Sequence, residues 1–187
     1  MSGDRDKEKS FTDDDSRNSN NDSKFLVEIY QEDGTSWQAE FKSGDSEFSN
    51  VYQHPNREDL IVVSGGQGYV VNPETQQKTE TFGGEITHAI ELRSAHQILF
   101  KSGHQFIVYN VQGLLWKQII PMLHELRQLN DEGRSILTGE QKATADADWQ
   151  PFWMNTDTGQ TYSEKYDCLK IVIERNGIKQ RPWWKIW

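Results

Sequence analysis

The apolar positions of this chain form a pattern that recurs at a distance of 37 residues. Each copy consists of an apolar triplet, a turn with glycine and a second apolar triplet: residues 61–63, 65–66 and 69–71, then residues 98–100, 102–103 and 106–108. Gly66 aligns with Gly103, and Tyr69 aligns with Phe106. Two apolar runs joined by a short glycine turn are typical of a β-hairpin. The repeat therefore predicts stacked β-units.

Alternation between apolar and polar residues predicts further strands on both sides of the first copy. Residues 25–30 lead through the hairpin signal Asp33-Gly34 into residues 37–41. This hairpin is expected to bury one face, formed by Val27, Ile29, Trp37, Ala39 and Phe41. Residues 86–92 alternate in the same way between the two copies. The chain is thus expected to form an antiparallel strand every eight to twelve residues.

One segment departs from this alternation. Leu123, Leu126 and Leu129 follow one another at a spacing of three, and Pro121 suits the first position of a helix. We therefore predict a short helix that begins near residue 121 and ends near residue 130. The prediction for the whole chain is a mainly β fold, with either an antiparallel two-layer sandwich or a partial propeller-like stack of hairpins, and one short helix.

Similar turns follow three of the apolar strands, at residues 72–76, 110–113 and 155–160. Residues 72–77 (Asn-Pro-Glu-Thr-Gln-Gln) and residues 155–160 (Asn-Thr-Asp-Thr-Gly-Gln) match in character, because Asn, Asp and Gly adopt the required turn conformations. The hairpins and turns over residues 59–118, with an echo at 149–162, resemble blades of β-propeller proteins of the Trp-Asp or quinoprotein type. The sequence contains no Trp-Asp dipeptide. Three or four such units are also too few to close a propeller ring, so the resemblance concerns local architecture.

The composition changes along the chain in a way that predicts three parts. Residues 1–23 contain one large apolar residue, Phe11, among polar and charged residues, and we predict that they are disordered. Residues 24–180 are predicted to form a single β-rich domain. Residues 181–187 form a Trp-rich C-terminal segment.

The net charge of −9 over 187 residues disfavours a general nucleic-acid binder, which needs a basic face. It suits either a basic protein partner or simply solubility. A single cysteine, Cys168, excludes an internal disulfide. Residues 1–9 lack the apolar stretch of a secretory signal, and no run approaches the roughly 20 apolar residues of a membrane span. We therefore expect a cytoplasmic protein without a transmembrane segment.

Residues that suggest chemistry are all explained more simply by structure. His88, His96 and His104 are eight residues apart, whereas metal ligands usually come in closer pairs. Cys168 precedes an apolar strand, as a buried thiol does. Residues 64–68 are glycine-rich but join two strands, whereas a phosphate-binding loop opens a helix. We predict no metal, no cofactor and no catalysis.

The strongest candidate for an interaction is the C-terminal segment. The residues expected to bind a partner are Arg181, Trp183, Trp184, Lys185 and Trp187. Trp and Arg dominate binding hot spots because they bury a large area with few rotors. The sequence leaves two other roles open, namely a strap that completes the core and an anchor on a lipid surface.

These observations predict a cytoplasmic protein-interaction module without catalysis, such as an immunity-type or adaptor protein that holds a basic partner. The alternative is a small-ligand or carbohydrate-binding protein that uses Trp149, Trp153 and Tyr162, since exposed aromatic rings stack on sugar faces. An enzyme ranks third, because it would need side chains such as His88 and His104 to meet an acid in one pocket.

Overall fold

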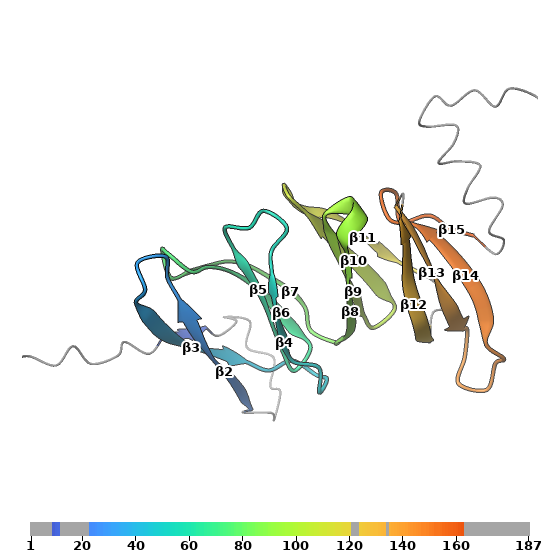
Figure 1. Ribbon diagram of the computed structural model, residues 1–187. Helices are drawn as coiled ribbons and strands as arrows, with labels where there is room; N and C mark the ends of the chain where they lie inside the picture. The colour runs from blue at the N-terminus through green and yellow to red at the C-terminus, as the bar shows by residue number, and fades with distance from the viewer. Residues whose placement is uncertain (1–8, 12–22, 121–123, 134, 163–187) are drawn as a thin grey trace, which may run out of the picture. The chain divides into compact units, whose positions relative to one another are not determined.

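The computed structural model describes residues 9–11, 23–120, 124–133 and 135–162, and almost all of its regular structure is β-strand. The prediction of a mainly β fold is confirmed. The chain divides into two compact units. The first unit comprises Met1–Glu91 and His96–Ile119, and the second comprises Leu92–Ala95 and Ile120–Trp187. Figure 1 labels the strands.

The strands form four sheets, each mainly or wholly antiparallel. The first sheet has the order β1-β3-β2, with β1 (Lys9–Phe11), β2 (Lys24–Tyr30) and β3 (Ser36–Lys42). The second contains β4 (Asn50–Gln53), β5 (Leu60–Ser64), β6 (Gln67–Asn72) and β7 (Gln77–Gly83). The third contains β8 (Ile86–Leu92), β9 (Gln97–Ser102), β10 (Gln105–Asn110) and β11 (Gly113–Ile119). The fourth contains β12 (Glu125–Gly133), β13 (Ile136–Lys142), β14 (Gln150–Asn155) and β15 (Thr161–Tyr162). A short 3₁₀ turn, η1 (Arg93–Ala95), lies between β8 and β9.

The two copies of the sequence repeat are the central hairpins of the second and third sheets, as predicted. Their turns meet the backbone requirements of two-residue hairpins. Gly65 and Gly66 both have positive φ, at 52° and 88°, which suits a type I′ turn. In the other copy Gly103 has φ 54°, and His104 completes the turn. The 37-residue spacing thus reflects two consecutive four-stranded meanders.

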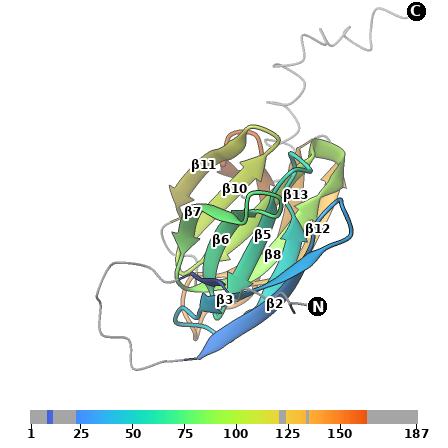
Figure 2. The same ribbon diagram turned by 90° about the vertical axis from the view of Figure 1, so that its left-hand side faces the viewer.

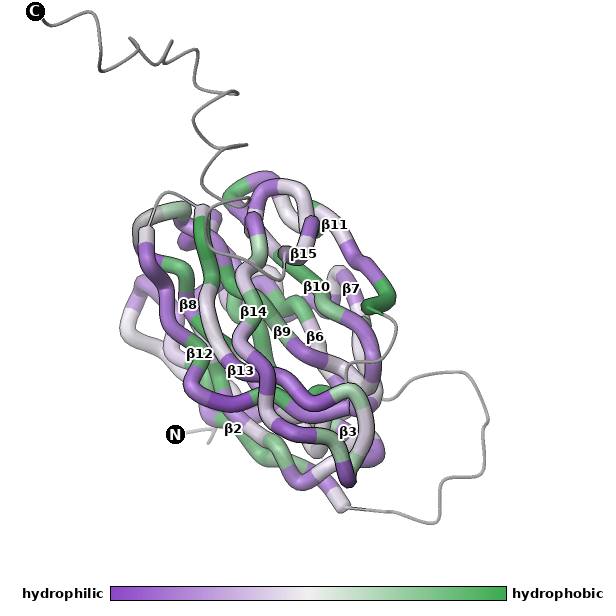
Figure 3. Tube along the Cα trace, turned by 90° about the vertical axis from the view of Figure 1, so that its right-hand side faces the viewer, coloured by the Kyte–Doolittle hydropathy of each residue, from purple (hydrophilic) through white to green (hydrophobic). Residues whose placement is uncertain are grey.

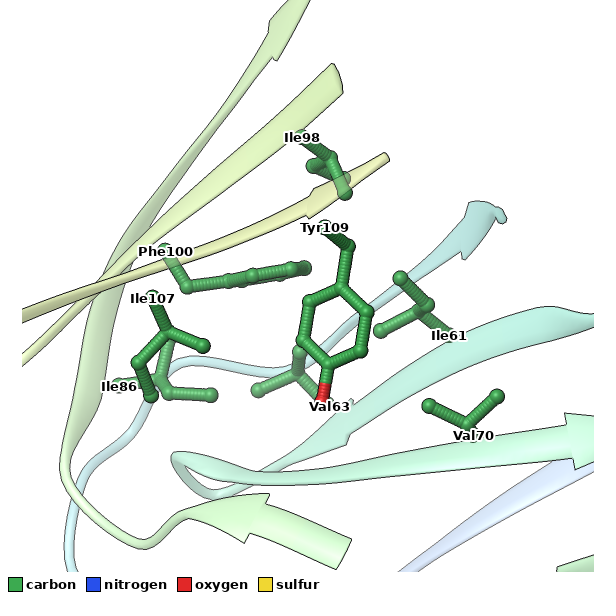
Figure 4. Close-up of a cluster of buried hydrophobic side chains, with 8 residues drawn as sticks. All are labelled: Ile61, Val63, Val70, Ile86, Ile98, Phe100, Ile107 and Tyr109. Carbon is green, nitrogen blue, oxygen red and sulfur yellow. The ribbon is translucent and has the colours of Figure 1, made fainter. Parts of the chain in front are cut away.

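In the first unit each face of the second sheet contributes to a buried cluster. Figure 2 shows the strands of the three sheets of this unit overlapping in the view. Val62, Tyr69 and Val71 pack against the first sheet, in the cluster that contains Trp37 and Phe41. The opposite face joins the third sheet in a second cluster: Ile61, Val63, Val70, Ile86, Ile98, Phe100, Ile107 and Tyr109 (Figure 4). Because the middle sheet has two buried faces, this unit is a stack of three sheets and not a two-layer sandwich.

The predicted turn similarity is confirmed in detail. Asn72 Oδ1 accepts hydrogen bonds from the backbone N–H of Thr75 at 2.9 Å and from its hydroxyl at 3.1 Å. Asn155 Oδ1 accepts the same pair from Thr158, at 3.1 and 3.2 Å. The second and fourth sheets therefore use one kind of capped turn after an outgoing strand.

The predicted helix is wrong, because the part of it that the structure describes is strand β12. The register between β12 and β13 shifts after Arg127, so that Gln128 and Leu129 lie opposite Gly139 alone. Gln128 has φ 54°. A bulge adds one residue to a strand, and Leu126 and Leu129 thereby reach the same face at a spacing of three. The bulge accounts for the spacing of Leu126 and Leu129, whereas Leu123 lies outside the described residues.

Within the segment predicted to be disordered, residues Lys9–Phe11 form strand β1, which pairs in parallel with β3. The ring of Phe11 stacks on Phe41, with centroids 5.3 Å apart. These three residues are therefore part of the first sheet. The remainder of residues 1–22, and residues 163–187, lie outside the described residues, so the three-part division of the chain stays a prediction.

Candidate functional site

The outer strand of the third sheet, β11, exposes an unusual number of large apolar side chains. Of the exposed large hydrophobic residues among the described ones, four lie within nine positions: Val111, Leu114, Leu115 and Ile119, with exposed fractions of 46, 42, 37 and 67%. The others, Leu26, Tyr30 and Val51, lie on β2 and β4. In Figure 3 the strand β11 ends in a hydrophobic stretch, drawn in green. Exposed apolar side chains that gather on one part of a protein surface are typical of interaction sites.

The hairpin β10–β11 holds this surface in place. Residues 105–108 of β10 pair with residues 116–119 of β11, and the register shifts next to Tyr109. Every apolar residue of β10 is buried, including Ile107 and Tyr109, which belong to the cluster between the second and third sheets. The buried strand β10 thus supports β11, and the apolar side chains of β11 extend beyond that core.

One charge lies among these apolar residues. Lys117 is exposed and pairs with Ile107 across the hairpin. Within the described parts of the chain, no carboxylate lies within ion-pair distance of its Nζ. We call Leu114, Leu115, Lys117 and Ile119 the β11 surface. It combines apolar area with one cation that is available to a ligand.

The alternative site predicted from sequence lies on the fourth sheet, and the structure brings only part of it together. Trp153 of β14 pairs with Tyr162 of β15, and both pack on Ile136. Trp149 lies four positions before Trp153. Its ring is covered by two cations: Arg127 Cζ at 4.0 Å and Lys142 Nζ at 5.0 Å from the ring centroid.

Arg127 also forms an ion pair with Glu140, with Nε and Oε2 2.6 Å apart. Four residues along a strand correspond to about 13 Å, so Trp149 and Trp153 are separate aromatic positions. Asp146 and Asp148 are exposed in the preceding loop. The fourth sheet therefore offers one aromatic pair, Trp153 with Tyr162, and a distant ring that already carries cations.

The C-terminal candidates Arg181, Trp183, Trp184, Lys185 and Trp187 lie outside the described residues, as does Cys168. Their assignment as partner-binding residues stays a prediction. The histidines His88 and His104 lie on β8 and in the β9–β10 turn. Within the described ranges, no group of three or more His, Cys, Asp or Glu side chains is arranged to hold a metal ion.

One buried histidine was not singled out from the sequence. His54 is 2% exposed, and its Nδ1 accepts a hydrogen bond from the backbone N–H of Asn56 at 3.1 Å. Its ring meets Tyr109 edge-on, with centroids 5.7 Å apart. Burial lowers the pKa of His54, although Asn56, Asp59 and Glu80 act in the opposite direction. Burial also raises the pKa of Tyr109, with Glu80 adding to the effect.

His54 and the residues around it stabilise the folded core of the first unit. Asp59 accepts hydrogen bonds from Asn56 Nδ2 at 2.8 Å and from Asn72 Nδ2 at 2.9 Å, which ties the β4–β5 connection to the end of β6. A histidine whose Nδ1 is engaged by its own loop, packed on a core tyrosine, is explained by folding.

No helix among the described residues is long and apolar enough to cross a membrane. No family model and no curated protein sequence matches this chain. Among solved structures, the chain is similar to Hsv2 of Kluyveromyces lactis, with 10% sequence identity and a TM-score of 0.27. The match covers 57% of this chain and 41% of Hsv2, so the chain spans less than half of that structure. Similarity at this level assigns neither a family nor a function to the chain.

Proposed function

We propose that this chain is a non-catalytic protein-interaction module that holds its partner on the β11 surface. The observation that carries the proposal is the exposure of Leu114, Leu115 and Ile119 on one outer strand. These side chains are 42, 37 and 67% exposed, so a partner that covers them gains roughly half of the about 1.5–3 kcal/mol that burying a fully exposed side chain of this size gives. A cytoplasmic location is part of the proposal.

The overall charge bears on the partner. A chain with a net charge of −9 attracts a basic protein over a distance, which raises the association rate at low salt. Contact on the β11 surface is then apolar and depends little on salt. The proposal therefore predicts an association rate that falls as salt rises, together with a dissociation rate that changes little.

Co-purification from the native host tests this function with single substitutions. Ile119→Ser removes the most exposed side chain of the β11 surface, and Leu26→Ser is the matched control on the outer strand β2, where Leu26 is 55% exposed. The partner should be lost from the first variant and retained by the second. Equal retention by both folded variants would show that the partner binds elsewhere. In that case, truncation after Gln180 tests the C-terminal segment as the docking peptide.

A second candidate function rests on the contact between Trp153 and Tyr162, two neighbouring and partly buried rings that pack on Ile136, since aromatic faces can stack on a sugar. Titration with oligosaccharides, followed by tryptophan fluorescence, tests it. A change that disappears in Trp153→Ala and persists in Trp149→Ala would support a sugar site at the pair. No change with any oligosaccharide would count against this candidate.

A further inference from the structure

The outer edge of strand β11 exposes backbone N–H and C=O groups in addition to its apolar side chains. Among the described strands it has a neighbour, β10, on one side only. An open edge of this kind can accept another strand, because its outward N–H and C=O groups are unpaired within the sheet. Side-chain exposure and backbone exposure thus coincide on one element.

The register indicates which backbone groups point outward. Ser102 and Gln105 flank a two-residue turn, which makes them a hydrogen-bonded pair, so odd-numbered residues of β10 bond to β9. Even-numbered residues of β10 then bond to β11, where Phe106 lies opposite Gln118. By the same alternation, the N–H and C=O groups of Lys117 and Ile119 are directed away from β10.

Charge indicates what the added strand should contain. Lys117 lies between apolar residues and lacks a carboxylate partner among the described residues. Opposite charges that face each other across strands stabilise a pair by roughly 0.2–1 kcal/mol. A second copy of this chain fits less well, because its β11 contributes a lysine to the seam and both chains carry a charge of −9.

We propose that β11 accepts an extended, apolar segment of the partner protein as an additional strand, with an Asp or Glu of that segment opposite Lys117. The inference rests on the proposed function and specifies how the β11 surface is used. Backbone hydrogen bonds to Lys117 and Ile119 hold the segment, and apolar side chains of the segment cover Leu115 and Ile119. In recognition of this kind, main-chain hydrogen bonds give the affinity and side-chain contacts give the specificity.

Proline tests the backbone contribution. Ile119→Pro removes an N–H that points outward, and it leaves the even-numbered ladder to β10 intact, as proline is tolerated on an edge strand. Ile119→Val keeps the N–H and serves as the matched control. The probe is a displayed library of random peptides selected on the full chain, and circular dichroism confirms that each variant is folded.

The selected peptides should alternate apolar residues and carry an acidic residue. Their affinity should fall about threefold to tenfold in Ile119→Pro and stay within about twofold in Ile119→Val, since a lost hydrogen bond costs about 0.5–1.5 kcal/mol. Lys117→Glu should invert the preference from acidic to basic peptides. Should Ile119→Pro fail to fold, the best peptide is resynthesised with N-methyl groups on alternate amides, and one of the two methylation patterns should abolish its binding.

The experiments distinguish a failure of strand addition from a failure of the proposed function. Peptides that lose affinity for Leu114→Ser but not for Ile119→Pro would overturn strand addition and leave the proposed function standing. Peptides insensitive to both substitutions, or an absence of selected peptides, would count against both. A dimer of the chain that Ile119→Pro dissociates, measured by sedimentation, would replace the partner segment with a second copy.

Discussion

The β5–β6 turn at Gly66 bonds to the start of β8 in the third sheet and to the segment before β4, and substitution there tests that arrangement. The carbonyl of Gly66 accepts hydrogen bonds from the N–H groups of Gly84 and Ile86, both at 3.0 Å, and its own N–H donates to the carbonyl of Phe48 at 2.9 Å. An added Cβ would lie 2.5 Å from Ser46 Oγ and 2.9 Å from the backbone nitrogen of Ile86. Gly66→Ala must therefore displace the backbone between β7 and β8.

The expected loss of stability has two parts. Positive φ costs a side chain about 1–2 kcal/mol. Gly34→Ala measures this part alone, because Gly34 has φ 83° and no atom within 4 Å of an added Cβ. At Gly66 the backbone of Ile86 must also move, which weakens two hydrogen bonds worth about 0.5–1.5 kcal/mol each. We expect a decrease in unfolding free energy of about 2–5 kcal/mol for Gly66→Ala and about 1–2 kcal/mol for Gly34→Ala.

Urea denaturation followed by circular dichroism measures both values, with the m-value compared between variants to confirm that the transition is the same. The argument would be refuted by a Gly66→Ala variant that is no less stable than Gly34→Ala. Such a result would mean that the Gly66 turn tolerates a side chain and that its hydrogen bonds to the neighbouring sheets contribute little to stability.

Two further predictions concern the cores of the two units. Because burial lowers the pKa of His54, the unfolded chain binds a proton more readily; the unfolding free energy should be level above about pH 6.5 and fall as the pH decreases below it. His54→Asn retains an acceptor for Asn56 and should reduce that acid slope in urea titrations at several pH values, whereas an unchanged slope would exclude His54 as a source. Gly139→Ala would place a Cβ 2.8 Å from Leu129 Cδ2, so it should destabilise the second unit by about 1–3 kcal/mol in thermal melts. Leu129→Ala should relieve part of that loss, and additive effects of the two substitutions would contradict the contact.

Hairpins were predictable because their determinants are local. The alternation of Trp37, Ala39 and Phe41 and the glycines of the Gly65-Gly66 turn specify strand and turn within a few residues. The β12 strand was missed because its bulge at Gln128 is visible only once β13 lies beside it. A leucine spacing of three is compatible with a helix or with a bulged strand, and the pairing partner decides between them.

The candidate site depends on sheet order, which the sequence does not show. Val70 in β6 and Leu114 in β11 both stand in apolar runs, yet Val70 is 4% exposed and Leu114 is 42% exposed. Val70 lies in the buried cluster between the second and third sheets, whereas Leu114 belongs to an outer strand with a neighbour on one side only. The apolar run that begins at Gly113 is too short to span a membrane, and the sequence alone assigned it no binding role. Its position at a sheet edge gives those side chains another use, since an exposed apolar edge either aggregates or is covered by a partner. We propose that a partner covers this edge, and the Ile119→Pro experiment tests whether it does so with an added strand.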